Sequence, residues 1–476
     1  MGCTLGLLVG IAFVRFSPIL VLGMLVAIIF ISAAPKRPEI ALLGMLIATS
    51  SIVFEEKLPI ISTGIGSFHI PDIILLGLLG LIVMRRFFDP GFRFVHTPLD
   101  WPLLIFFSLT LLSTFIALYQ SSVEFETARR AIRVLSYYLT FFIVTNLVRD
   151  RRQLNFLLNG FFLLATIVAV GMIGQFLLGD SVNILPGRVE SLSTQGVLFE
   201  DIVRIAPPGF SIVLVSFVTI LCTLVLEKFK PHGLLKFLQC GLLGIALLIT
   251  FLRSYWAVLF LILFLLLYIL RGDERPRFIG WGLVILFTAS MSLLIVLNNP
   301  GSRVAKLVEA SMHRLSTLVN SRIYQDEDTY GGWRKIENEY AFNTITSNPW
   351  IGLGMGAKYR PLDSRLDYRS ADGVEHDFRG LIHNSHLTIM LQSGLIGYTV
   401  FIWISLIFLI RGFKYWRSVA NKRLRGIMLG FTLVYLAILI AAIANSTFMQ
   451  WRWTPVIGII MGINEVLLRN VDKAQQ

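Results

Sequence analysis

The stretch LIHNSHL at residues 381–387 is followed directly by the apolar run TIMLQSGLIG at residues 388–397. It marks the point where a long polar segment gives way to a segment hydrophobic enough to enter a bilayer. The stretch therefore places the imidazoles of His383 and His386 and the amide of Asn384 at a boundary between water and lipid. Such a boundary suits chemistry on a substrate that is attached to a lipid.

The rest of the chain has the composition of a polytopic membrane protein. Of its 476 residues, 55% are hydrophobic and only 15% are charged, and the mean hydropathy is +0.73. One soluble core could not bury that much apolar surface, so we predict an all-α polytopic membrane protein. The net charge of +13 is assigned to cytoplasmic loops, where basic residues of membrane proteins gather, and no nucleic-acid partner is expected. The three cysteines lie in or beside apolar runs, so neither a disulfide framework nor a zinc-type pairing of cysteines is expected.

Apolar runs bounded by charges, prolines or glycines predict about 12 to 14 transmembrane helices. The candidate ranges are 2–14, 17–34, 39–54, 70–87, 100–119, 133–148, 154–178, 205–227, 234–251, 254–271, 277–297, 387–411, 426–444 and 453–468. This pattern divides the chain into three parts. Transmembrane helices with short loops occupy 1–297, one long loop occupies 298–386, and transmembrane helices with a cytoplasmic tail occupy 387–476.

The positions of Lys and Arg in the short loops predict the orientation of the chain. When the spans alternate, the basic clusters fall on one side, which is predicted to be cytoplasmic and to hold both termini. The long loop at 298–386 then lies on the outer side. Within it, helical spacing of apolar residues predicts an amphipathic helix over 304–319 that lies on the outer leaflet, and a second helix from Trp333 to about Thr346.

Three interpretations of the His383 and His386 pair are open from the residues alone. Helical spacing could supply two metal ligands, with an acidic and imidazole cluster nearby at 375–377. Asn384 and Ser385 are good helix caps, so the pair could also be purely structural. Alternatively, one histidine is a general base, because imidazole titrates nearest to neutral pH, and Asn384 positions the substrate or the base.

Arginines on the outer side are informative because the charge bias opposes them and a charge at membrane depth costs a few kcal/mol. Arg253 lies at a tight junction of two spans, and it is either a phosphate or diphosphate ligand or an arginine that reaches the headgroups. Substrate binding and salt bridges to Glu124 or Glu126 are both open for Arg129, Arg130 and Arg133.

Two more features of the long loop need an interpretation. Arg334 could bind substrate or pair with Glu337 or Asn338 one turn further along the second helix. The glycines at 352, 354 and 356 lack the strand and helix that a phosphate-binding fingerprint requires. We predict that they let the chain turn back toward the membrane.

Several of these motifs together resemble the O-antigen ligase and polymerase superfamily. They are NPWIGLGMG at 348–356, His383-Asn384 followed by Leu387, Gly394 and Gly397, the segment RDRRQL at 149–154, and Arg253 at the opening of a span. The resemblance covers most of the chain, and the His-Asn-x-x-Leu region with its two glycines carries it most specifically.

The resemblance implies a GT-C-like fold and a metal-independent, inverting glycosyltransferase of the bacterial inner membrane that needs no cofactor. Such an enzyme transfers a glycan from undecaprenyl diphosphate to a hydroxyl acceptor, such as lipid A core, on the periplasmic side, in contact with membrane lipids. It implies that His383 is catalytic and that Arg253 and Arg334 bind the diphosphate. The supporting candidates are Asn384, His386, Arg129, Arg130 and Arg133.

Two other functions are kept as alternatives. An O-antigen or exopolysaccharide polymerase would use the same base and diphosphate ligands, so local motifs do not separate it from a ligase. A flippase or transporter of lipid-linked sugars belongs to another class, and it would carry charges deep in several spans. Here the spans are nearly free of charge at mid-depth and the polar residues gather on one side, which favours an enzyme.

Overall fold

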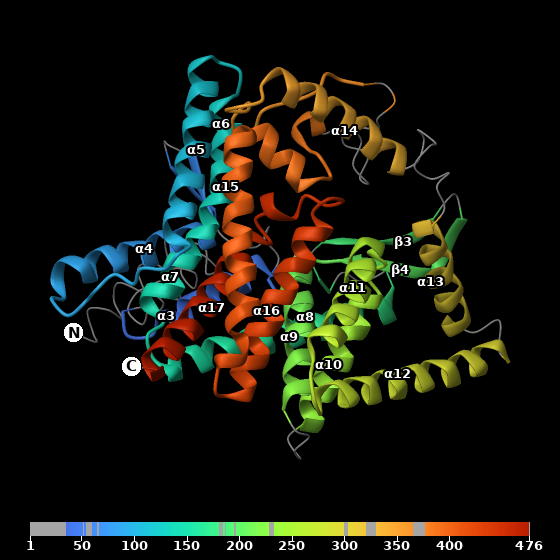
Figure 1. Cartoon of the computed structure of the whole chain (residues 1–476). Helices are drawn as coiled ribbons and strands as arrows, with labels where there is room; N and C mark the ends of the chain where they lie inside the picture. The colour runs from blue at the N-terminus through green and yellow to red at the C-terminus, as the bar shows by residue number, and fades with distance from the viewer. Residues whose placement is uncertain are drawn as a thin grey trace, which may run out of the picture.

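The computed structural model describes residues 35–50, 52–53, 60–63, 66–179, 184–185, 187–194, 197–227, 233–298, 303–319, 330–363, 365 and 377–475. This part of the chain is mainly helical (Figure 1). The fold therefore agrees with the predicted all-α class. The candidate spans at 2–14 and 17–34 lie outside the described residues.

The helices follow one another along the chain. The N-terminal ones are α3 (Pro38–Thr49), α4 (Ile70–Phe88), α5 (Asp100–Tyr119), α6 (Phe125–Ser136), α7 (Thr140–Leu147) and α8 (Arg151–Leu178). The central ones are α9 (Phe210–Leu226), α10 (Gly233–Leu248), α11 (Arg253–Ile269), α12 (Glu274–Leu297), α13 (Arg303–Val319) and α14 (Tyr330–Ser347). The C-terminal ones are α15 (Ser385–Tyr415), α16 (Lys422–Ala441) and α17 (Thr454–Gln475). Long connections lie between α8 and α9 and between α14 and α15.

Four helices of the described part are long and apolar enough to cross a membrane. They are α5, α8, α16, and α15 together with the short 3-10 turn that extends it to Ser418. The helices α3, α9, α10 and α11 are also apolar but shorter. The protein is thus an all-α membrane protein, and the count of about 12 to 14 spans stays a prediction.

The predicted span at 133–148 is not one helix. Instead, α6 ends at Ser136, a 3-10 turn covers Tyr137–Leu139, and α7 begins at Thr140. The physical reason is the composition of α6, which carries Arg129, Arg130 and Arg133 and is strongly amphipathic. The helix α7 has no charged side chain, so the charges that are unfavourable in hydrocarbon lie in α6 alone.

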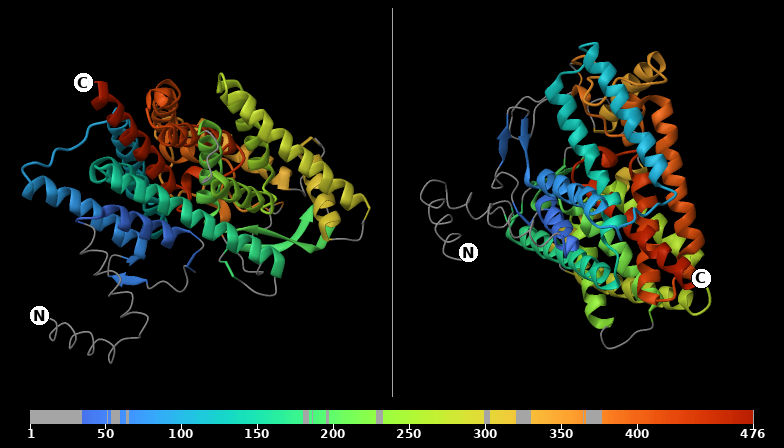
Figure 2. Two further views of the ribbon diagram at one scale, coloured as in Figure 1. Left: turned by 90° about the horizontal axis from the view of Figure 1, so that it is seen from below. Right: turned by 90° about the vertical axis from the view of Figure 1, so that its left-hand side faces the viewer.

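Two connections form antiparallel β-hairpins that the hydropathy pattern does not predict. The first pairs β1 (Ile61–Thr63) with β2 (Gly66–Phe68), and the second pairs β3 (Arg188–Thr194) with β4 (Val197–Ala206). Figure 2 shows α8 running between the N-terminal helices and the second hairpin, and it packs on both α3 and β4. The second hairpin thus extends the helical body at one end.

The amphipathic helix predicted at 304–319 is present as α13. Ala310 of α13 is completely buried in a cluster with Leu192 and Ile202 of the second hairpin, Phe251 just before α11 and Trp256 within α11. Met312, on the predicted apolar face, is 64% exposed. The second hairpin therefore covers part of α13, and the position of this helix on the outer leaflet stays a prediction.

The helices α9 and α16 pack tightly in the core, where small residues let the backbones approach. A Cβ atom added to Gly430 of α16 would lie 2.5 Å from the Cα atom of Thr219 of α9. Gly426 is similarly close to Thr223, four residues further along α9. Such small residues at four-residue spacing are typical of tightly packed membrane helices.

We expect Gly430→Ala to lower the melting temperature in detergent by several degrees, because the new methyl group would overlap the Thr219 backbone and overpacking costs about 1–3 kcal/mol. Gly241→Ala in α10 is the matched control, since nothing lies within 4 Å of its added Cβ. The control should leave the melting temperature unchanged or raise it, because alanine favours helix. Equal melting temperatures for the two variants would contradict this packing.

The loop that contains Gly352, Gly354 and Gly356 is held between α5 and α15, an arrangement that we call the clamp. The clamp positions the chain that leads to His383 and His386. Gly394 has φ +69° and interrupts α15, and a Cβ there would lie 2.0 Å from the Trp350 carbonyl oxygen. The loop provides hydrogen-bond partners for the backbone groups that the interruption leaves unpaired. Leu353 N donates to Leu391 O at 2.7 Å, and Leu395 N donates to Pro349 O at 2.7 Å. These bonds to the loop replace bonds that an uninterrupted α15 would make within the helix.

The three loop glycines all adopt the left-handed conformation that glycine tolerates, with φ between 78° and 82°. Gly354 lies against α5 and Gly356 against Thr127 of α6. Thr114 of α5 accepts from Met355 N through its hydroxyl oxygen at 3.0 Å. As predicted, the glycines turn the chain, and they do so between two helices.

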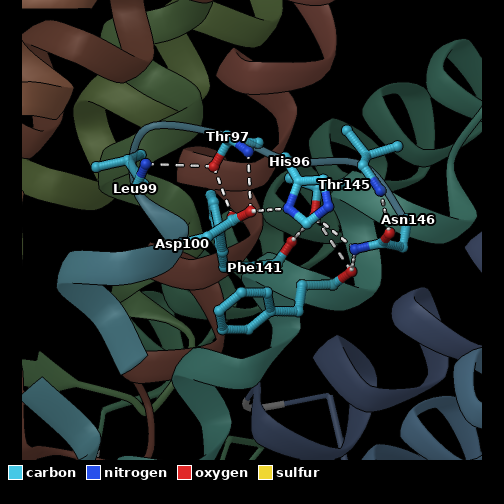
Figure 3. A network of polar contacts seen from close by, with 9 residues as sticks. His96, Thr97, Leu99, Asp100, Phe141, Thr145 and Asn146 are labelled. Atoms are coloured by element: carbon cyan, nitrogen blue, oxygen red, sulfur yellow. Dashed lines mark hydrogen bonds and ion pairs between the residues drawn. The ribbon is translucent and has the colours of Figure 1, made fainter. Parts of the chain in front are cut away.

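The opposite end of α5 is held by a network of short polar contacts (Figure 3). Asp100 accepts from the backbone N of Thr97 at 2.8 Å and from its hydroxyl at 2.7 Å. Asn146, in the last turn of α7, accepts from Val95 N at 2.9 Å. The start of α5 is therefore fixed to the end of α7, so α5 is a rigid support for the clamp at its other end.

Candidate active site

The backbone at His383 is fixed by the cap of α15. The side chain of Asn384 accepts from His386 N at 3.0 Å and from Leu387 N at 3.2 Å. Free N–H groups in the first turn of a helix need such an acceptor, and asparagine is among the preferred residues. The cap therefore holds His383 directly before the first turn of α15.

The imidazole of His383 lies against a buried carboxylate from α14. Its Nδ1 is 3.0 Å from Oε2 of Glu337, and the backbone N of His383 donates to the same oxygen at 3.0 Å. The His383 side chain is 41% exposed, whereas that of Glu337 is 3% exposed. One carboxylate oxygen thus contacts both the ring and the backbone of His383 on the protein side.

Glu337 has a second cationic neighbour in Arg360. The Nη2 atom of Arg360 is 3.6 Å from Oε1 of Glu337, and the Arg360 side chain is also 3% exposed. Nη2 donates in addition to the carbonyl oxygen of Phe378 at 3.1 Å. The buried carboxylate therefore lies between an arginine and an imidazole.

The segments around Arg360 and before His383 are bonded to each other. Tyr359 N donates to Arg379 O at 3.3 Å, and Lys358 lies 2.8 Å from Asp377. Hydrogen bonds from Arg379, together with Lys358, hold the pKa of Asp377 well below its usual range. These contacts keep Arg360 and His383 on the same side of α14.

His386 has a different environment from His383. Its Nε2 donates to the carbonyl oxygen of Leu439 in α16 at 2.9 Å, because a carbonyl can only accept. Its Nδ1 lies 3.2 Å from the hydroxyl of Tyr398. Both ring nitrogens of His386 are thus bonded within the protein, where they join α15 to α16.

The start of α11 and the start of α15 are tied to one residue of the connection between α16 and α17. Asn445 donates from Nδ2 to the hydroxyl of Ser254 at 3.1 Å. The carbonyl oxygen of Asn445 accepts from the Ser385 hydroxyl at 2.9 Å. Because Ser254 follows Arg253 and Ser385 lies two residues after His383, this bridge links the two backbones that carry these side chains.

We expect Asn445→Ala to lower kcat/KM about tenfold and the free energy of unfolding by about 1 kcal/mol, since it removes the bond to Ser254 and loosens the start of α11. Ser254→Ala removes the same bond and should also lower kcat/KM, whereas Asn445→Ala additionally loses the bond from Nδ2 to Ala441 O. The double variant should be no worse than Asn445→Ala, because both single variants remove the bond between Asn445 and Ser254. If the losses of kcat/KM in the two single variants add up in the double variant, Asn445 and Ser254 do not act through one shared hydrogen bond.

The arginines of α6 form ion pairs with nearby carboxylates. Arg129 makes a two-pronged contact with Glu126 at 2.6 and 3.0 Å and donates to Ser67 O at 3.0 Å. Arg130 is 3.6 Å from Glu126, and Arg133 is 4.0 Å from Asp72. The hydrogen bond from Arg129 lowers the pKa of Glu126. The salt bridges expected from the sequence therefore occur with Glu126, and no described contact joins these arginines to His383.

Arg334 lies on α14, three residues before Glu337, and its side chain is half-buried. Helix positions three residues apart share a face, so Arg334 and the carboxylate behind His383 belong to the same side of α14. Figure 1 shows α14 at one end of the molecule, together with α6 and the ends of α5 and α15. The predicted second loop helix thus carries both Arg334 and Glu337.

Metal ligands were one interpretation of the histidine pair. Within the described ranges, no group of three or more His, Cys, Asp or Glu side chains could hold a metal ion. Glu375 and His376 lie outside the described residues.

The sequence alone does not identify Glu337 as the partner of His383. The two residues are 46 positions apart, and the sequence placed Glu337 only as a partner for Arg334. The signal that could have found it is an acidic residue on a helix of the same loop, but Glu339 of that helix gives the same signal. No local sequence pattern marks Asn445 as a functional residue, because the residues around it predict only the end of a transmembrane helix.

Comparison with known families agrees with the motifs. Residues 238–402 match a family model described as O-antigen ligase. The matched region contains Arg253, Arg334, Glu337 and His383. No curated protein matches the chain at a significant level. The predicted resemblance is confirmed: this region of the chain is similar to the O-antigen ligase family, whose members are glycosyltransferase-like enzymes.

Proposed function

We propose that this protein is an inner-membrane glycosyltransferase that transfers a glycan from undecaprenyl diphosphate to a hydroxyl of lipid A core on the periplasmic side. One observation carries the proposal. Within the O-antigen ligase match, a half-exposed imidazole with a buried carboxylate behind it lies at the start of a membrane-spanning helix. A base at that position can reach a substrate that is anchored in lipid.

The chemistry requires three tasks of the protein. A lipid diphosphate is already a good leaving group, so the enzyme has to hold it, stabilise the negative charge that develops on it, and accept a proton. Nε2 of His383 takes the proton of the acceptor hydroxyl, and the hydroxyl oxygen forms a bond to the anomeric carbon. The bond between that carbon and the diphosphate oxygen breaks, undecaprenyl diphosphate leaves as an anion, and the configuration at the sugar inverts.

Arg253 and Arg334 bind the diphosphate in this proposal. A guanidinium group offers parallel N–H donors that match phosphate oxygens, and it stabilises the charge of the leaving group. Arg253 is the first residue of α11, where the helix dipole also favours an anion. Arg334 shares α14 with Glu337, which contacts His383.

The remaining candidates support the structure. Asn384 fixes the backbone of His383 as a cap, and His386 holds α15 against α16. Arg129, Arg130 and Arg133 have carboxylate partners, so we assign them to the packing of α6. The proposed reaction uses neither a metal nor a cofactor.

The proposal includes a GT-C-like arrangement in which residues 298–386 lie in the periplasm. The basic residues at 411–425 follow the far end of α15, opposite to His383 at its start. Since basic clusters mark the cytoplasmic side, this separation supports a periplasmic position for His383.

An assay with purified protein separates the ligase from the polymerase. We expect glycan to appear on lipid A core when lipid-linked donor and core lipid are both supplied, and no product when the donor is alone. Longer lipid-linked chains from the donor alone would instead identify a polymerase. Folded protein that forms neither product, but moves the donor across vesicles, would contradict a glycosyltransferase and indicate a flippase.

A further inference from the structure

We infer that Glu337 is the positioning residue that orients His383 for proton transfer, and that Arg360 supplies the counter-charge which keeps Glu337 in place. This inference rests on the proposed function, in which His383 is the base. The carboxylate is assigned from its contacts, since it lies 46 positions from His383 in the sequence.

The contacts define which nitrogen of His383 faces the substrate. A carboxylate can only accept hydrogen bonds, so Nδ1, at 3.0 Å from Oε2 of Glu337, carries the proton. In the neutral ring Nε2 is then the unprotonated nitrogen, and no described residue is hydrogen-bonded to it. The ring is 41% exposed while the carboxylate behind it is 3% exposed. Nε2, the unprotonated nitrogen of His383, therefore lies on the side of the ring that points away from the buried Glu337.

The same oxygen of Glu337 also fixes the direction of the ring. It accepts from the backbone N of His383 at 3.0 Å, so a rotation of the imidazole away from Glu337 would break the ring contact while the backbone contact remains. When Nε2 takes a proton, the imidazolium forms directly beside the carboxylate. That charge pair stabilises the state that follows proton transfer.

Arg360 explains how a carboxylate can be held in this buried position. An ionised carboxylate out of water is unfavourable unless a cation or several donors compensate it. Arg360 is equally buried and lies 3.6 Å from the oxygen that faces away from the His383 backbone. Its bond to Phe378 O keeps it there. The three residues form a line from Arg360 through Glu337 to His383.

The test is Glu337→Gln in the full-length protein, with Asp363→Asn as the matched control. Asp363 is also a buried carboxylate of the same segment, but it accepts from Arg365 and Tyr340. For Glu337→Gln we expect a loss of kcat on the order of 10²-fold and an unchanged KM for the lipid-linked donor. For Asp363→Asn, kcat and the KM for the lipid-linked donor should both stay within about twofold of the parent.

Two results would overturn the inference. One is wild-type kcat in Glu337→Gln; the other is an equal loss of kcat in Glu337→Gln and Asp363→Asn, which would indicate a role in the fold alone. Should Glu337→Gln fail to fold, Glu337→Asp decides. It keeps the carboxylate but shortens it, so kcat should fall while the KM for the lipid-linked donor stays unchanged, and an unchanged kcat with a changed KM would overturn the inference. An inactive His383→Ala with a normal Glu337→Gln would refute only the inference, whereas a fully active His383→Ala would refute the proposed function.

Discussion

His383→Ala is expected to lower the rate of glycan transfer by about 10³- to 10⁴-fold in a protein that still folds. General-base catalysis contributes a factor of about 10² to 10⁴, and no described side chain beside His383 can replace the exposed nitrogen, because Glu337 is buried behind the ring. Single-turnover measurements with lipid-linked donor and core lipid would detect this loss. Truncation at an exposed ring should cost little stability.

His386→Ala is the matched control for this prediction. Its ring makes two hydrogen bonds that join α15 to Tyr398 and to α16. We expect His386→Ala to melt at a lower temperature than the parent and to lose much less rate than His383→Ala. The reason is that the His386 ring is hydrogen-bonded within the protein, whereas the His383 ring is half-exposed. Full transfer activity of His383→Ala in a well-folded membrane preparation would show that the base is another group.

Arg253→Lys is expected to lower kcat/KM about 10²-fold, and Arg253→Ala about 10³-fold. Lysine keeps the positive charge but loses the parallel donors of the guanidinium fork, whereas alanine removes both. The loss should appear in donor binding and in the rate, since the diphosphate gains charge as it leaves. Steady-state kinetics at varied donor concentration would separate the two contributions.

The comparison variant is Arg129→Lys, because Arg129 is another arginine that the sequence marks as a candidate and its guanidinium is bonded to Glu126 and Ser67. We expect its kcat/KM to stay within about threefold of the parent, since exposed ion pairs contribute little. Equal losses for Arg253→Lys and Arg129→Lys would contradict the assignment of the diphosphate to Arg253.

Hydropathy and spacing predicted much of the helical structure. The ranges 100–119 and 154–178 correspond to α5 and α8, because long apolar runs between charges leave few alternatives. The helices of the polar segment, α13 and α14, also follow from spacing and from the Ser-Asn-Pro stop at 347–349. The cap by Asn384 was visible as a local signal.

Contacts between distant segments could not be predicted in this way. The pairing of Glu337 with His383 depends on how the glycine loop turns between α5 and α15, and that turn is set by the break at Gly394. The glycines turn the chain, but nothing in a single sequence shows that the backbone groups of Pro349 and Leu353 bond to the interrupted helix α15. Similarly, Asn445 reaches Ser254 only after α11 and α16 have packed.

The two hairpins and the division between α6 and α7 were missed for a related reason. Apolar β-branched residues in β4 suit either a strand or the edge of a span, and only pairing with β3 decides between them. The apolar run that includes α7 hides the end of α6, because the charged residues stop at Arg133, just before it. In both cases contacts between distant segments, and not the local sequence pattern, determine the secondary structure.

The most direct measurement is the position of undecaprenyl diphosphate bound to the full-length protein, determined by electron cryomicroscopy in a lipid nanodisc. We predict that the diphosphate lies at the start of α11 against Arg253, on the side of the membrane where His383 begins α15. The exposed Nε2 of His383 should face the position of the leaving sugar. A diphosphate bound instead among the basic residues at 411–425, at the far end of α15, would contradict the account.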